Sequence, residues 1–120
     1  MPNRVVHFEI MGREGEELPA FYRSLFEWPV AVGEPVHGYA QFCPVPPADG
    51  GIGGGIGAAD GTCFITVYVE VDDLDATCES ATALGAELVL PPTTIPEIDD
   101  LRIARVRDPH GNLLGLVQRR

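Results

Sequence analysis

The chain has 120 residues, of which 45% are hydrophobic and 22% are charged, a composition typical of one soluble globular domain. A domain of this length buries roughly two-thirds of its surface on folding, and it leaves no room for a second domain of ordinary size. The formal net charge is -10, so nucleic acids and anionic membranes would repel the chain on average. The sequence also has no apolar run of about 18 residues, and it predicts a cytoplasmic protein with no membrane partner.

The three cysteines, Cys43, Cys63 and Cys78, are odd in number and contain no Cys-x-x-Cys pair. Neither a disulfide framework nor a zinc finger is expected from this spacing. Cysteine is among the residue types most often buried, so packing is favoured over a role as a nucleophile.

The first half of the chain opens with a predicted strand over residues 5–10. Apolar side chains occupy every second position, and His7 and Glu9 lie on the opposite face. A helix is expected over residues 18–26, with acidic residues before its first turn and Pro29 beyond its end. Short extended segments then follow over residues 30–36, 38–45 and 51–58.

The second half repeats this order. A strand is expected over residues 63–71, with Thr66, Tyr68 and Glu70 on one face. Asp72 or Asp73 can cap the helix that follows, and Gly85 suits its C-terminal end. Further strands are predicted over residues 86–90, 101–107 and 113–117, with a turn at 108–112. The repeat predicts two βαβββ modules, about 1–60 and about 61–120, in a single domain over residues 1–120.

Six prolines punctuate the predicted strands, namely Pro44, Pro46, Pro47, Pro91, Pro92 and Pro96. Because proline cannot donate to a sheet ladder, these residues are expected to bound strands and to stay out of central ones. The segment 91–100 is therefore predicted to be a mobile loop.

The motifs HFEI, FYRSLFEW, VEVDDLDAT, LGAELVLPP and DPHGNLLGLVQ occur in this order along almost the whole chain. In this order the chain resembles the glyoxalase/bleomycin resistance/dioxygenase group, also called the vicinal oxygen chelate (VOC) superfamily. The resemblance implies an α+β fold in which two βαβββ modules form a cup-shaped mixed sheet with helices outside, usually as a homodimer. It also implies a range of activities, from metal-dependent lyases, isomerases, epimerases and dioxygenases to proteins that only sequester drugs.

The metal ligands that the resemblance implies come from the first and last strands of each module. His7 matches the first position, and Thr66, a poor ligand for a divalent transition metal, takes the equivalent place in the second module. The last strand of the first module, residues 50–57, holds only glycine and isoleucine, and the matching position of the second module is Gly115. No resident metal or other cofactor is therefore expected. A divalent metal held by His7 with carboxylates at Glu9 and Glu70 stays as the less favoured alternative.

The glycine-rich segment fits neither phosphate-loop pattern. We interpret it as a strand with a bare inner face that leaves room for a ligand, with a neighbouring chain as the alternative. Tyr39 and Gln41 are expected to share the ligand-facing side of their strand, leaving Ala40 and Phe42 toward the core. The predicted ligand-binding set lines the cup and comprises His7, Glu9, Gln41, Thr66 and Tyr68.

Arg102 and Arg105 lie on opposite sides of one predicted strand, so one of them could reach the cup. Three functions stay open. The favoured one is a small-molecule-binding VOC protein that lacks the usual metal site, with sequestration of an organic or drug-like ligand as one version. The alternative is a lyase or isomerase, with or without a metal, in which His7 or Glu9 moves a proton beside a carbonyl, and which residues would be catalytic is left open. The third is a subunit whose glycine-rich strand pairs with another protein.

Overall fold

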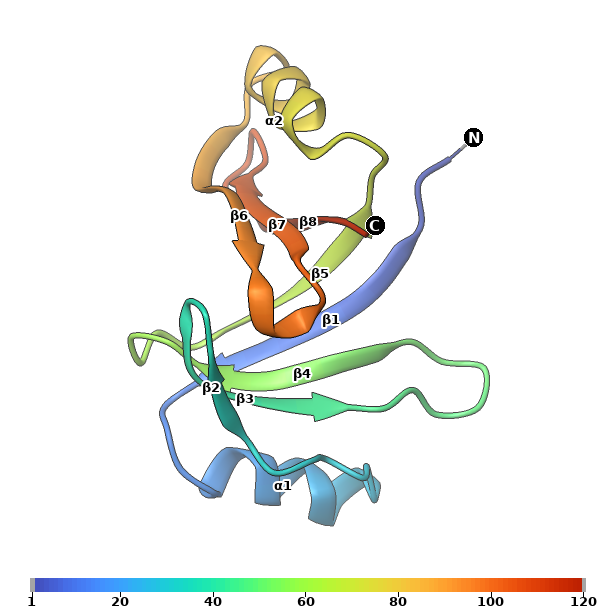
Figure 1. Cartoon of the computed structure of the whole chain (residues 1–120), viewed down its shortest axis with the longest axis vertical. Helices are drawn as coiled ribbons and strands as arrows, with labels where there is room; N and C mark the ends of the chain where they lie inside the picture. Colours follow the sequence, from blue (N-terminus) through green and yellow to red (C-terminus); the bar gives the residue numbers. More distant parts are fainter. Residues whose placement is uncertain (1, 120) are drawn as a thin grey trace. The chain divides into compact units, whose positions relative to one another are not determined.

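The computed structural model describes residues 2–119, which divide into two compact units. We call residues 7–65 module 1, and residues 66–119 together with residues 2–6 module 2. Figure 1 shows the course of the chain through both units.

The two modules repeat one order of elements. The first set comprises β1 (Val5–Gly12), α1 (Glu17–Phe26), β2 (Glu34–Val36), β3 (Tyr39–Val45) and β4 (Gly53–Ala58). The second set comprises β5 (Phe64–Glu70), α2 (Leu74–Ala83), β6 (Glu87–Ile95), the single 3-10 turn η1 (Pro96–Ile98), β7 (Leu101–Arg107) and β8 (Leu113–Gln118). The predicted βαβββ repeat is confirmed.

The strands of each module pair in the same way. In module 1 the order is β2-β3-β4-β1, with β1 and β4 parallel and the other pairs antiparallel. In module 2 the order is β6-β7-β8-β5, and here β5 and β8 are the parallel pair. Each module therefore brings its first and last strands side by side, and its helix crosses over from the first strand to a second strand that runs parallel to it at the far end of the strand order.

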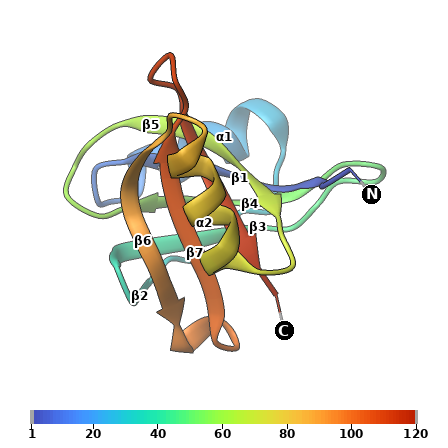
Figure 2. The ribbon, with the colours of Figure 1, turned by 90° about the horizontal axis from the view of Figure 1, so that it is seen from above.

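Each helix packs on one face of its own sheet. In module 1, Leu18 and Tyr22 of α1 cover a cluster that includes Ile10, Cys43 and Ile56. In module 2, α2 lies across β6 and β7 (Figure 2), and its Leu74 and Cys78 enter a second cluster, with burial raising the pKa of the Cys78 thiol. The structure shows Cys43, Cys63 and Cys78 as free thiols.

The ends of α2 follow from local sequence. The Asp73 side chain accepts a hydrogen bond of 3.0 Å from the backbone N–H of Ala76, which makes it the N-terminal cap. Gly85 follows the helix with φ +102°, a conformation that residues with a Cβ rarely adopt. Each helix has 10 residues, and among residues 2–119 no helix is long and apolar enough to cross a membrane.

Two expectations about proline were wrong. Strand β6 continues through Pro91 and Pro92 to Ile95, so the first half of the predicted mobile loop is strand. Strand β6 is the last strand in the order of module 2, so its outer edge pairs with no further strand of the module and a proline there breaks no hydrogen bond of the sheet. Its pairing with β7 is also irregular on either side of Leu90. Pro44 likewise lies inside β3, beyond the part of β3 that β2 pairs with.

Candidate functional site

The sheet face of module 1 that points away from α1 carries a buried carboxylate. Phe8 and Ile10 of β1 belong to the helix-covered cluster, so His7 and Glu9 point to the opposite face. Glu9 is only 2% exposed, and its Oε2 accepts a hydrogen bond of 2.7 Å from the Tyr39 hydroxyl. His7 is half-buried two residues earlier on the same face. The structure thus brings two of the predicted ligand-binding residues together.

Aromatic rings lie beside this carboxylate. The ring centroids of Tyr39 and Phe42 are 5.3 Å apart, with planes 62° apart in an edge-on arrangement. A Cβ built on Gly55 would overlap the Phe42 ring, and Gly55 is paired with Glu9 across the β1–β4 ladder. Phe42 therefore shares the face of Glu9, and its expected place on the core side was wrong.

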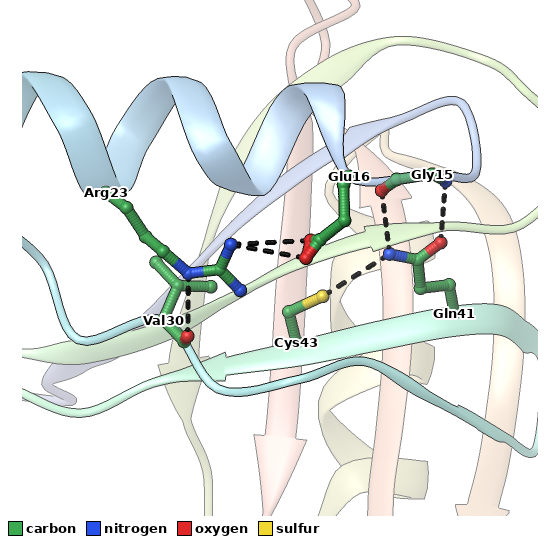
Figure 3. A network of polar contacts seen from close by, with 6 residues as sticks. All are labelled: Gly15, Glu16, Arg23, Val30, Gln41 and Cys43. Carbon is green, nitrogen blue, oxygen red and sulfur yellow. Dashed lines mark hydrogen bonds and ion pairs between the residues drawn. The ribbon is translucent and has the colours of Figure 1, made fainter.

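Gln41 lies on the other face, against the segment that leads into α1 (Figure 3). Its Oε1 accepts from the backbone N–H of Gly15 at 2.8 Å, and its Nε2 donates to the carbonyl of Gly15 at 3.0 Å. The same Nε2 lies 3.5 Å from the sulfur of Cys43, a core residue. Gln41 thus fixes the loop before α1, and the expectation that it shares a sheet face with His7 and Glu9 was wrong.

In module 2 the face away from α2 carries Thr66 and Tyr68, which are 4% and 2% exposed. The Thr66 hydroxyl donates to the carbonyl of Leu113 at 2.9 Å, which ties β5 to β8. The Tyr68 hydroxyl accepts a hydrogen bond of 2.9 Å from Nε of Arg105. A buried tyrosine hydroxyl is thereby satisfied by a cationic donor.

The two arginines of β7 have separate roles. Arg102 points to the helix side, where it donates to both carboxylate oxygens of Asp75 at 3.1 and 3.2 Å. This contact lowers the pKa of the Asp75 carboxyl. Either arginine was expected to be able to reach the cup, and Arg105 is the one that lies on the face of Tyr68.

The glycines of β4 accommodate aromatic rings of the same chain. A Cβ on Gly54 would lie 2.5 Å from the Phe8 ring, and one on Gly57 would lie 2.9 Å from the Gln41 carbonyl. With Phe42 over Gly55, the interpretation of this strand as a bare surface that leaves room for a ligand was wrong. The glycines permit close approach of neighbouring side chains and backbone.

Strand pairing relates the two modules internally. Glu9 of β1 is paired with Gly55 of β4, and Tyr68 of β5 is paired with Gly115 of β8. Both pairs are parallel and join the first and last strands of a module. Gly55 and Gly115 are therefore equivalent positions of the repeat.

The family model of the Glyoxalase/Bleomycin resistance protein/Dioxygenase superfamily matches residues 4–116. The chain belongs to this superfamily. Comparison with curated protein sequences found no match. The predicted fold class, α+β with two βαβββ modules of the glyoxalase/bleomycin resistance type, is confirmed.

Solved structures of superfamily type share this fold at low sequence identity. A hypothetical protein from Bacillus halodurans C-125 has a TM-score of 0.75 at 12% identity, covering 100% of this chain and 96% of that one. Methylmalonyl-CoA epimerase from Mycobacterium tuberculosis has a TM-score of 0.68 at 18% identity, covering 97% and 87%. A variant of the Streptomyces coelicolor methylmalonyl-CoA epimerase, in complex with 2-nitronate-propionyl-CoA, has a TM-score of 0.67 at 17% identity, covering 96% of each chain.

Metal-dependent members of the superfamily raise the question whether these residues fit a divalent ion. On the face of His7 and Glu9, strand β4 presents only glycines. In module 2, Thr66 donates its hydroxyl proton to a carbonyl and Gly115 has no side chain. Within residues 2–119, no group of three His, Cys, Asp or Glu side chains is placed to hold a metal ion. A zinc-type site needs at least three protein ligands, so the donor set described here does not fit one. That the protein uses no metal cofactor stays a prediction.

Tyr39 was expected on the ligand-facing side of its strand and lies there, whereas Phe42 was misplaced and Arg105 was left undecided. Arg105 could not be placed from its neighbours, because Ala104 and Val106 on one face of β7 are matched by the apolar Leu101 and Ile103 on the other. Phe42 could not be placed either, because residues 39–45 carry apolar side chains on both faces and their alternation has no unique reading.

Proposed function

We propose that the protein binds a small organic molecule, and that it does so without a metal ion at the positions where metal-dependent members of the superfamily hold one. The observation that carries this proposal is the buried carboxylate of Glu9, hydrogen-bonded to Tyr39 on the sheet face that α1 does not cover. Burying a carboxylate costs free energy unless hydrogen bonds or charges compensate it. Ligand pockets typically combine an apolar lining with a few placed polar groups that fix the orientation of the ligand, and Glu9 with Tyr39 offers such a group.

Further features support this proposal. His7 and Thr66 supply hydrogen-bonding groups, and Tyr39 and Tyr68 combine an apolar ring with a polar hydroxyl. In the sequestration version of the proposal, the ligand is a cationic drug-like molecule, because a net charge of -10 attracts cations. The predicted ligand set, with Gln41 removed, is thus His7, Glu9, Thr66 and Tyr68.

A thermal-shift screen of the whole protein tests this proposal. The protein is kept in chelator and screened against matched organic amines, neutral isosteres and carboxylic acids. At least one compound is expected to raise the melting temperature in a saturable way, because binding only the folded state stabilises it by mass action. If no compound class shifts the melting temperature while the protein is folded, the proposal is wrong.

The second candidate is an enzyme, a lyase or isomerase with or without a metal. The 2.7 Å hydrogen bond between Glu9 and Tyr39 favours it, because a carboxylate beside a phenol can relay a proton to or from a carbon next to a carbonyl. The epimerases among the similar structures support the same class of chemistry. Incubation with α-branched thioesters in D₂O distinguishes the two candidates. Exchange of the α-proton by the wild type, lost in Glu9→Gln, supports the enzyme. Absence of exchange across the whole thioester series contradicts it.

We also propose that the protein is a cytoplasmic homodimer. The outer face of α1 supports self-association, because Phe21, Leu25 and Phe26 are 55%, 57% and 51% exposed. Light scattering after size exclusion is expected to give twice the mass of the 12.9 kDa chain. A monomer mass at micromolar concentration would contradict the homodimer and leave the binding proposal in place.

A further inference from the structure

Two aromatic rings lie over glycines in the last strand of each module. The Phe42 ring lies over Gly55, the ladder partner of Glu9, and the Tyr68 ring lies over its own ladder partner, Gly115. We infer that these rings close both positions from which the last strand of a module could send a metal-binding side chain. Two obstacles then oppose a divalent transition-metal site: residues 2–119 bring no three metal-binding side chains together, and the aromatic rings fill the space that new ligands would need. A metal site can be opened only by changing a ring and its glycine together.

The geometry in module 2 is the tighter one. A Cβ on Gly115 would lie 2.5 Å from Cδ2 of Tyr68 and 2.6 Å from its Cγ, so it meets the root of the ring as well as its outer edge. Tyr68 is 2% exposed and its hydroxyl is held by Arg105. The ring therefore has little freedom to move aside.

In module 1 the Phe42 ring overlaps the Cβ position of Gly55 in the same way, and this overlap is easier to remove by substitution. A Cβ on Gly55 would overlap Cζ and Cε1 of Phe42, which are at the far end of that ring. Phe42 is only half-buried, so it can be shortened at lower cost than Tyr68. Gly55 is the ladder partner of Glu9 and lies diagonally across from His7 on the same face. Side chains in these positions are within reach of one another.

This placement predicts a specific rescue. Once Phe42 is truncated, a carboxylate introduced at position 55 would stand beside Glu9 and near His7, giving one imidazole and two carboxylates on one sheet face. Three such ligands are the minimum for a zinc-type site. Without the truncation, the same carboxylate would have to displace the Phe42 ring.

The test uses four whole-chain variants and Zn²⁺ alone as the probe. Phe42→Ala/Gly55→Glu is compared with Gly55→Glu, Phe42→Ala, and the double variant carrying His7→Ala. Titration calorimetry and melting temperature are recorded with and without Zn²⁺. The double variant is expected to bind Zn²⁺ at least about tenfold more tightly than either single variant, and the added His7→Ala should remove that gain.

A stability cycle keeps the inference testable if the charged variant does not fold. Gly55→Ala is measured by urea unfolding in the wild-type and Phe42→Ala backgrounds. The unfolding equilibrium constant is expected to change at least about tenfold less in the Phe42→Ala background, because the overlapping ring is gone. The inference is overturned if Gly55→Ala costs the same in both backgrounds. It is also overturned if Gly55→Glu alone folds like wild type and binds Zn²⁺, or if the folded double variant binds none.

Discussion

Replacing Gly115 with alanine is expected to lower the free energy of unfolding by about 1–3 kcal/mol, the usual cost of forcing an extra methyl group into a packed region. The new methyl group would lie 2.5 Å from the Tyr68 ring, which neighbouring β7 anchors through Arg105. Either the Tyr68 ring must move or the pairing of β5 with β8 must be distorted. Urea unfolding followed by circular dichroism measures the change, with the slope of the unfolding curve checked for constancy.

The matched control is Gly51→Ala. A Cβ at Gly51 would come no closer than 3.4 Å to any other atom, and the residue lies in an exposed loop. This variant is expected to stay within about 0.5 kcal/mol of wild type. Equal stability of the two variants would show that Tyr68 does not confine Gly115.

Glu9→Gln is expected to weaken binding of the compound that gives the largest thermal shift by about ten- to a hundredfold. A hydrogen bond to a charged group contributes about 1.5–3 kcal/mol, and glutamine keeps the size of the side chain and an oxygen for Tyr39 while losing the charge. Titration calorimetry on both proteins measures the ratio of dissociation constants.

The control for Glu9→Gln is Glu87→Gln, the same chemical change at an exposed residue of β6. It changes the net charge of the protein by the same amount and should leave the dissociation constant unchanged. If both variants weaken binding equally, overall charge is responsible and Glu9 is not a ligand contact. If Glu9→Gln binds as tightly as wild type, Glu9 has no part in the site.

The repeat was the part of the fold that sequence could predict. Strand 101–107 was placed at its observed bounds, the cap of α2 was expected at Asp72 or Asp73 and is Asp73, and the exit through Gly85 followed from local chemistry. These features depend on residues within a few positions of each other. Local patterns of this kind are what a single sequence determines best.

The errors arose where position in the sheet decides the outcome. Pro91 and Pro92 lie inside β6 because that strand has an open outer edge, and nothing in the local sequence reveals which strand is the outermost one. The facing of Gln41 and Phe42 was inverted because the irregular pairing of β2 with β3 breaks the simple alternation near Tyr39. The glycines of β4 were assigned to a ligand because their aromatic neighbours come from other strands.

The central claim is that this member of the superfamily works without a metal at the usual positions. Elemental analysis of protein purified without chelator, alongside His7→Ala, tests it most directly. We expect far less than one bound transition metal per chain in both proteins, and we expect chelator to leave the ligand-induced thermal shifts unchanged. One metal per chain in the wild type, lost in His7→Ala, would contradict it.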